Sequence, residues 1–280
     1  MNDDRAGTWR RTGRRLWRAP LVVLHVLVGI GVAALLRPGR NGQVSCRPLA
    51  IWSRVLCGIL GVRVVVEGHP HADAVLFVAN HMSWLDIFCI ASVCPTHFLA
   101  KREVADWPLF GWLSRRAGTA FIRRGGENGA GEASEQLTWR LRNGGRMLVF
   151  PEGTSTVGET VRRFYPRLFQ SAILTRCPVQ AIALRYPWGN GLHPDVPFVG
   201  DATLLPHLWR LLGERRIVAE LRFCAPLSTA GQTRDGLAQR TRSQVLDALA
   251  GSTSEHLAVR VTTPTGRGRT DKHRNGCWER

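Results

Sequence analysis

Val75-Leu-Phe-Val-Ala79 is a short apolar run that leads directly into Asn80-His-Met-Ser-Trp-Leu-Asp86, and this stretch decides the fold. Uninterrupted apolar residues over such a length are typical of a strand buried on both faces of a sheet. A helix is expected directly afterwards, over Ser83–Val93. In α/β sheets, ligand sites lie where strands end and helices begin. The stretch therefore predicts an α/β fold with a functional site at His81 and Asp86.

His81 and Asp86 have the chemistry of a general base and the group that orients it. Five positions apart across a strand-to-helix turn, the carboxylate can fold back to one ring nitrogen and fix the tautomer. The other nitrogen is then free to take a proton from a hydroxyl. This corresponds to two members of a catalytic triad, with the substrate supplying the nucleophile.

A structural interpretation of Asp86 is also open. Ser83-x-x-Asp86 resembles a capping box, in which the acidic side chain only caps a helix. A histidine followed five residues later by an aspartate is, moreover, a weak pattern when taken alone. Capping and catalysis are compatible, so both interpretations are kept.

Segments of strand and helix type alternate around this stretch, which predicts a layered α/β/α domain with a mixed, mostly parallel central sheet. The expected strands are Val62–Glu67, Val75–Ala79, His97–Ala100, Thr119–Ile122, Met147–Phe150, Val179–Leu184 and Ile217–Phe223. The other expected helices are Glu132–Asn143, Phe164–Leu174 and Arg234–Leu249. We expect the domain to cover residues 46–250, followed by a basic, disordered tail over residues 251–280.

Residues 1–45 combine a basic N-terminus with an apolar run from Ala19 to Leu36. As a helix, this run would be roughly 27 Å long, just enough to cross a bilayer core. It could span the membrane once, lie in the interface, or be a cleaved signal peptide, and a buried core helix is the structural alternative. We favour a membrane-anchoring helix and rank the signal peptide last.

The formal net charge of +17 comes from 38 Lys plus Arg against 21 Asp plus Glu. Such an excess suits nucleic acid or an anionic membrane surface. A membrane-anchored nucleic-acid-binding protein is therefore one hypothesis, but the sequence shows no groove-reading helix and no zinc-type Cys/His cluster. The cysteines number 7, an odd count that favours reduced thiols in the cytoplasm over export. We expect neither a nucleic acid partner nor a metal.

Two further segments place polar residues at the ends of expected strands. Lys101 follows one strand, and Gly118-Thr-Ala-Phe121-Ile-Arg-Arg124 ends in paired arginines. A guanidinium group suits phosphate or carboxylate because it offers a planar fork of donors, although a solvated basic turn is commoner. In Phe150-Pro-Glu-Gly-Thr154, the turn would hold Glu152 where it can accept hydrogen bonds from substrate hydroxyls. An ordinary turn with a solvated glutamate is the alternative.

Together these segments resemble the glycerolipid acyltransferase family, whose bacterial type enzyme is 1-acyl-sn-glycerol-3-phosphate acyltransferase. Residues 49–184 carry the resemblance, and the family's four blocks occur in the same order and with matching spacing. The matched residues are, block by block, Asn80, His81 and Asp86; Gly118, Phe121, Ile122 and Arg124; Phe150, Pro151, Glu152, Gly153 and Thr154; and Pro178 before an apolar strand. Four ordered blocks are far more specific than any one of them.

The resemblance implies that His81 deprotonates the acceptor hydroxyl and that Asp86 orients His81. The alkoxide would attack the thioester of acyl-CoA or an acyl carrier protein, with no cofactor or metal required. The residues implied in binding the lysolipid acceptor are Asn80, Lys101, Gly118, Phe121, Arg124, Glu152, Gly153 and Thr154. We also expect the protein at the inner (cytoplasmic) membrane, beside its anionic surface, with the active site facing the cytoplasm.

The favoured acceptor is 1-acyl-sn-glycerol-3-phosphate, which would give phosphatidic acid, and lyso-ornithine lipid is the alternative. Two departures from the family pattern resemble the lyso-ornithine lipid branch, whose acceptor has no phosphate. Thr154-Ser-Thr156 stands where many members have Thr-Arg-Ser, and Phe164-Tyr-Pro-Arg167 lacks the Lys and Gly of Phe-Lys-x-Gly. A catalytically silent membrane scaffold is a third hypothesis, against which the intact His81 and Asp86 argue.

Overall fold

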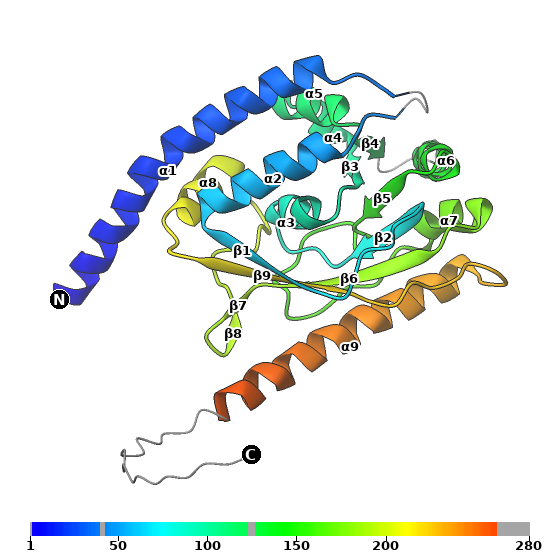
Figure 1. The fold of residues 1–280 in the computed structure, drawn as a ribbon. Helices are drawn as coiled ribbons and strands as arrows, with labels where there is room; N and C mark the ends of the chain where they lie inside the picture. Colours follow the sequence, from blue (N-terminus) through cyan, green and yellow to red (C-terminus); the bar gives the residue numbers. More distant parts are fainter. Residues whose placement is uncertain (1, 40–42, 123–126, 262–280) are drawn as a thin grey trace, which may run out of the picture.

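The computed structural model describes residues 2–39, 43–122 and 127–261, and Figure 1 shows a central sheet covered by helices on both faces. The sheet has seven strands in the order β1-β9-β6-β2-β5-β3-β4. Its strands are β1 (Val62–Glu67), β2 (Val75–Ala79), β3 (His97–Lys101), β4 (Ala120–Ile122), β5 (Arg146–Val149), β6 (Val179–Arg185) and β9 (Ile217–Phe223). All neighbouring pairs are parallel except β6 with β9, which confirms the mixed, mostly parallel sheet.

The helices form layers on the two faces of the sheet. They are α1 (Asn2–Leu35), α2 (Arg47–Leu60), α3 (Leu85–Val93), α4 (Arg102–Ala105), α5 (Pro108–Arg116), α6 (Glu127–Arg142), η1 (Pro166–Phe169), α7 (Gln170–Thr175), α8 (Leu204–Leu212) and α9 (Arg234–Val261). Buried residues of α2, α3 and α8 form the core on one face, and those of α6, α7 and α9 form the core on the other. A small hairpin, β7 (Pro187–Trp188) with β8 (Gly191–Leu192), completes the described fold.

Strand β2 lies at the centre of the sheet, and every one of its residues is buried. Val75, Phe77 and Ala79 belong to the core that includes α2 and α3, whereas Leu76 and Val78 belong to the opposite core. Alternation of side chains along a strand explains this division. Burial of both faces explains why the sequence is apolar without interruption. The apolar run and β2 both end at Ala79.

The expected strands all occur, with ends displaced by no more than one residue. The expected helix over Phe164–Leu174 instead begins as the 3₁₀ turn η1 at Pro166 and continues as α7, because proline fixes φ and is suited to a first turn. Helix α9 continues to Val261, past the expected domain end at residue 250. Residues 262–280 of the expected tail lie outside the described residues, and the division of the chain stays a prediction.

Helix α1 is longer than the expected apolar run and lies along α2, α5 and α8 (Figure 1). The guanidinium of Arg18 is buried and donates hydrogen bonds to the carbonyl oxygens of Leu60, Leu212 and Glu214. These carbonyls belong to the last turns of α2 and α8 and the residues after α8, which have no partner within their own helix. One arginine thus fastens the basic half of α1 to two other helices.

The apolar half of α1 is also held against the domain. His25 and Trp52 exchange ring-to-carbonyl hydrogen bonds of 3.0 Å and stack with ring centroids 4.4 Å apart. Near the end of α1, Arg116 donates to the carbonyl oxygens of Ala33 and Ala34. Within the described part of the chain, one helical segment is long and apolar enough to cross a membrane, Thr8–Leu35, whose apolar 18-residue window has a mean hydropathy of 2.0. Large apolar side chains along its outer side are exposed, among them Leu21, Val23, Leu24, Leu27, Val28, Val32 and Leu35.

Candidate active site

His81 lies just beyond the carboxyl end of β2, at the edge of the sheet, with Asp86 on the first turn of α3. The Nδ1 atom of His81 is 2.8 Å from Oδ2 of Asp86. Because a carboxylate only accepts hydrogen bonds, Nδ1 carries the proton and Nε2 has the free lone pair. The His81 side chain is 20% exposed and Asp86 is fully buried, so the ring has access to solvent while its partner has none. The structure therefore brings the two predicted residues together.

The Asp86 carboxylate is held from several directions. Its Oδ2 atom accepts hydrogen bonds from the backbone N–H of Met82 at 2.7 Å and of Ser83 at 2.9 Å, in addition to His81. The contact with the Ser83 N–H is the one that the acidic residue of a capping box makes, but α3 begins after Trp84, which has no side-chain cap. Asp86 therefore binds both the turn before α3 and the imidazole, and the first turn of a helix favours its negative charge.

Tyr186 is a site residue that sequence reasoning missed. It follows β6, is fully buried, and donates a hydrogen bond from its hydroxyl to Oδ1 of Asp86 at 2.7 Å. Burial raises the pKa of Tyr186 well above its usual value, and the charge of Asp86 acts in the same direction, so the phenol keeps its proton. Both oxygens of Asp86 are thereby engaged. The signal that could have indicated Tyr186 is its position directly after β6, a strand parallel to β2.

Glu152 reaches the same edge of the sheet, because β5 runs parallel to β2. Its Oε1 atom accepts the backbone N–H of His81 at 2.8 Å, and its Oε2 atom accepts the N–H of Arg162 at 2.7 Å. Burial raises the pKa of Glu152, while these two hydrogen bonds act in the opposite direction. In the structure this carboxylate therefore ties the His81 segment to the segment around Arg162, and its predicted contact with substrate stays a prediction.

Asn80 and Phe150 fix the surroundings of the imidazole. Asn80 is buried and exchanges two hydrogen bonds with the backbone of Leu184, at 2.9 and 2.8 Å, so it joins the end of β2 to β6. The ring of Phe150 stacks on His81 with centroids 4.0 Å apart. Together they restrict the position of the His81 backbone and one face of its ring.

The turn after Phe150 has the tight geometry that its sequence predicts. Gly153 has a φ of 71°, in the left-handed region that favours glycine, and its N–H donates to the carbonyl of Phe150 at 3.0 Å. Thr154 follows in the same turn and is half-buried. The side chain of Ser155 donates to the carbonyl of Phe198, so this position of the turn is directed into the protein.

Lys101 and the described part of the segment from Gly118 to Arg124 are divided between the two edges of the sheet. Lys101 ends β3 at the same edge as His81, two strands away in the sheet order. Phe121 lies in the middle of β4, whereas Gly118 precedes β4 and so lies at the opposite, amino edge. Arg124 lies outside the described residues. The structure therefore does not bring Gly118 to His81.

Gly118 has a structural requirement of its own. Its φ is 78°, and a Cβ atom added there would lie 2.9 Å from the ring of His97. Only glycine meets both conditions without strain. Its predicted part in substrate binding stays a prediction, since these two observations already account for the residue.

Known proteins are similar to this chain in sequence and in fold. The profile of the acyltransferase family matches residues 62–185. A lyso-ornithine lipid O-acyltransferase of Pseudomonas aeruginosa is 37% identical over 248 residues, 85% of this chain and 95% of the relative. A 1-acyl-sn-glycerol-3-phosphate acyltransferase of Neisseria gonorrhoeae is 32% identical, over 65% of this chain and 71% of the relative. The crystal structure of a 1-acyl-sn-glycerophosphate acyltransferase from Thermotoga maritima has a similar fold, with a TM-score of 0.63 at 21% identity, covering 90% of this chain and 98% of that chain.

Fold and site together define an enzyme that transfers acyl groups. A mixed α/β sheet carries a solvent-accessible imidazole at its edge, and a buried carboxylate orients that imidazole. The chain belongs to the acyltransferase family, whose relatives include enzymes of lipid biosynthesis. The resemblance inferred from the four sequence blocks is thus confirmed at the level of the family and of the enzyme class.

Proposed function

We propose that this protein transfers a fatty acyl chain from acyl-CoA or an acyl carrier protein to the free hydroxyl of lyso-ornithine lipid. The observation that carries the proposal is the contact between His81 and Asp86, which leaves Nε2 of His81 to face an acceptor. Sequence analysis favoured 1-acyl-sn-glycerol-3-phosphate as acceptor. The comparisons give at least as much support to lyso-ornithine lipid, since the Pseudomonas relative matches more of the chain at higher identity.

The Thr154–Thr156 turn supports the same choice of acceptor. Many family members have an arginine at the position that Ser155 occupies, and its charge would suit a phosphate. Here the Ser155 hydroxyl is bonded to the carbonyl of Phe198 and offers no cation. An acceptor without phosphate needs no cationic side chain at this position.

In the proposed reaction, Nε2 of His81 takes the proton of the acceptor hydroxyl while the hydroxyl oxygen attacks the thioester carbonyl. The tetrahedral intermediate then collapses, the carbon–sulfur bond breaks, and the imidazolium returns the proton to the leaving thiolate. Asp86 stabilises the imidazolium between these two steps. No covalent bond to the enzyme forms.

We further propose that α1 attaches the enzyme to the inner membrane while lying along the domain, with the active site facing the cytoplasm. The contacts of Arg18 and His25 hold both halves of α1 against α2 and α8. The exposed leucines and valines of its outer side would enter the acyl region, which is typical of an interfacial helix. If α1 instead crossed the bilayer, Arg18 and the helix ends that it contacts would have to enter the membrane. Placing a charged side chain there costs free energy.

The test is an acyl-transfer assay on the purified full-length protein with each acceptor and each donor, with lipid products identified by mass spectrometry. We expect product with lyso-ornithine lipid. In His81→Ala the rate should fall by about 10² to 10⁴ fold with the fold retained. The matched control is His69→Ala, which removes an exposed histidine on the loop after β1. Product with 1-acyl-sn-glycerol-3-phosphate alone would overturn the acceptor, and product with neither would overturn the function.

A further inference from the structure

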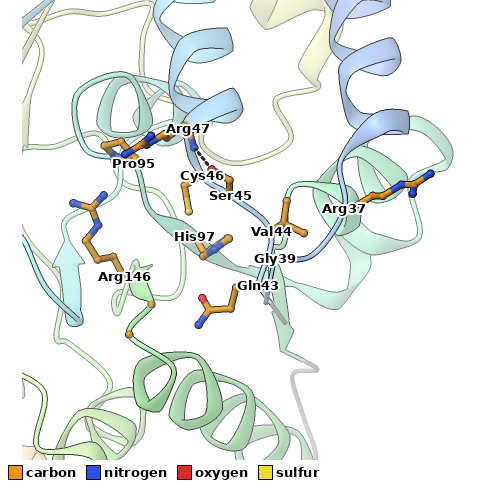
Figure 2. A pocket seen from close by; sticks show the side chains of 12 residues that line it. Arg37, Gly39, Gln43, Val44, Ser45, Cys46, Arg47, Pro95, His97 and Arg146 are labelled. Atoms are coloured by element: carbon orange, nitrogen blue, oxygen red, sulfur yellow. Dashed lines mark hydrogen bonds between the residues drawn. The ribbon is translucent and has the colours of Figure 1, made fainter. Parts of the chain in front are cut away.

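A cavity of about 410 Å³ lies at the opposite edge of the sheet from His81 and Asp86 (Figure 2). Arg146 begins β5 and pairs with Val75, the first residue of β2, and His97 begins β3. His81 lies six positions along the chain from Val75, beyond the other end of β2. At about 3.3 Å per residue in a strand, this is roughly 20 Å. The cavity therefore does not belong to the active site.

The lining of the cavity is strongly basic. It includes Arg37, Arg47 and Arg146, and no aspartate or glutamate is among its lining residues. Figure 2 shows the side chains of Arg47 and Arg146 reaching the same side of the opening, beside Pro95, whereas Arg37 points away from them. Within the described chain, no carboxylate forms an ion pair with these arginines. Two neighbouring guanidinium groups without a counter-charge are suited to one bidentate anion.

The start of α2 adds to the positive potential of the cavity. Ser45, Cys46 and Arg47 line the cavity where this 14-residue helix begins, and its first turn contains no acidic residue. The N–H of Arg47 donates to Oγ of Ser45 at 3.3 Å and Pro48 has no N–H, so this end contributes the positive end of the helix dipole rather than a set of free donors. An anion beside Arg47 would therefore meet a guanidinium close to that positive end.

A further arginine, Arg140, lies behind the wall of the cavity, where its carbonyl oxygen accepts a hydrogen bond from the lining residue Gln43. Burial and the nearby charge of Arg140 together lower the pKa of His97 to about 4. The neutral imidazole adds no charge of its own, so the positive potential of Arg146 and Arg140 is left for an external group.

We propose that this cavity binds a phosphate group, held by Arg47 and Arg146 beside the positive end of α2. Two sources supply that chemistry, the headgroup of an anionic phospholipid and a soluble phosphate. The location favours the headgroup, because Arg37 lies two residues beyond Leu35, which is 81% exposed at the end of the apolar face of α1. The binding site is separate from the acceptor site and requires no particular acceptor for the acyl transfer.

The first measurement is calorimetric titration of inorganic phosphate into the detergent-solubilised full-length protein. The site variant is Arg47→Gln with Arg146→Gln. The charge-matched control is Arg63→Gln with Arg240→Gln, which removes two exposed arginines of β1 and α9. We expect saturable binding by the wild type and the control, and binding weaker by about tenfold or more in the site variant.

Vesicle flotation then separates the two sources. A site variant that floats less than the control with phosphatidylglycerol vesicles, but equally with phosphatidylcholine vesicles, identifies the lipid headgroup. Equal flotation, together with the lost calorimetric signal, identifies a soluble phosphate. Absence of saturable phosphate binding in the wild type, or an equal loss in the control, overturns the proposal. Neither measurement depends on acyl transfer, so the outcome is independent of the proposed function.

Discussion

The hydroxyl of Tyr186 donates a hydrogen bond to Oδ1 of Asp86 at 2.7 Å, while Oδ2 of the same carboxylate contacts Nδ1 of His81 at 2.8 Å. One carboxylate thus connects a phenol on the segment after β6 to the imidazole on the segment after β2. Since Tyr186 reaches the reacting group only through Asp86, it is a positioning residue.

Tyr186→Phe should lower kcat for acyl transfer by about tenfold while leaving KM for both substrates unchanged. The change removes the hydrogen bond that fixes Asp86 and leaves Oδ1 unsatisfied, which should also cost about 1 to 3 kcal/mol of unfolding free energy. Steady-state kinetics and urea unfolding measure the two effects. Tyr165→Phe, the same change at an exposed tyrosine, is the matched control. An unchanged kcat in Tyr186→Phe would remove the positioning role.

Glu152 should make the unfolding free energy depend on pH in a characteristic direction. Burial raises its pKa in the folded state, so the folded protein holds the proton more tightly than the unfolded chain does. The stabilisation that Glu152 contributes is fully present below the usual carboxyl pKa. It is lost as pH rises through the raised pKa of the folded state.

The measurement is urea unfolding of the wild type and of Glu152→Gln between about pH 4 and pH 7. The difference in unfolding free energy, wild type minus variant, should decrease as pH rises, because the variant cannot titrate at this position. Other titrating groups are common to both proteins and cancel. A difference that increases with pH would show that the hydrogen bonds from His81 and Arg162 outweigh burial.

Gly118→Ala should destabilise the fold without weakening acceptor binding. Alanine at this position would have to adopt the left-handed backbone conformation of Gly118. Its Cβ atom would also lie 2.9 Å from the His97 ring. Gly144→Ala is the matched control, since its φ is 76° but nothing lies within 4 Å of the added atom. We expect Gly118→Ala to be the more destabilising by about 1 to 3 kcal/mol in urea unfolding. A raised KM for the acceptor with unchanged stability would instead support the predicted role in substrate binding.

The outer side of α1 should determine membrane attachment. Leu24 and Leu27 are 57% and 59% exposed, so replacing both by Glu should weaken vesicle binding but leave the melting temperature unchanged. Each leucine contributes about 1.5 to 3 kcal/mol when fully buried in an apolar phase. Val65→Glu with Val66→Glu, at two exposed positions of the edge strand β1, is the control. Flotation assays that detect no difference from this control would argue against attachment through α1.

The sequence predicted the pair His81 and Asp86 because their contact is local, formed across one turn. Tyr186 escaped prediction because its contact with Asp86 spans 100 residues and depends on β6 lying beside β2. The motif containing Gly118 suggested a single binding segment, yet the direction of β4 places its first residue at the far edge of the sheet. Proximity in sequence indicated the contact between His81 and Asp86, but it did not indicate at which edge of the sheet Gly118 lies.

The strands were predictable because their apolar runs are short and are bounded by turn residues. Helices α2 and α8 were not predicted, although both are amphipathic and each buries one side. Their helical period was therefore a signal present in the sequence, and exposed apolar side chains such as Ile51, Val55 and Leu205 accompany it. The roles of Glu152 and Asn80 depend on backbone partners brought by neighbouring strands, which no motif specifies.

Arg18 joins α1 to the ends of α2 and α8 through backbone carbonyls alone. An anchor fastened in this way cannot act as a flexible tether. On the proposed attachment, the imidazole would stand at a fixed height and angle above a single lipid leaflet, and only acceptors whose hydroxyl lies at that depth could reach it.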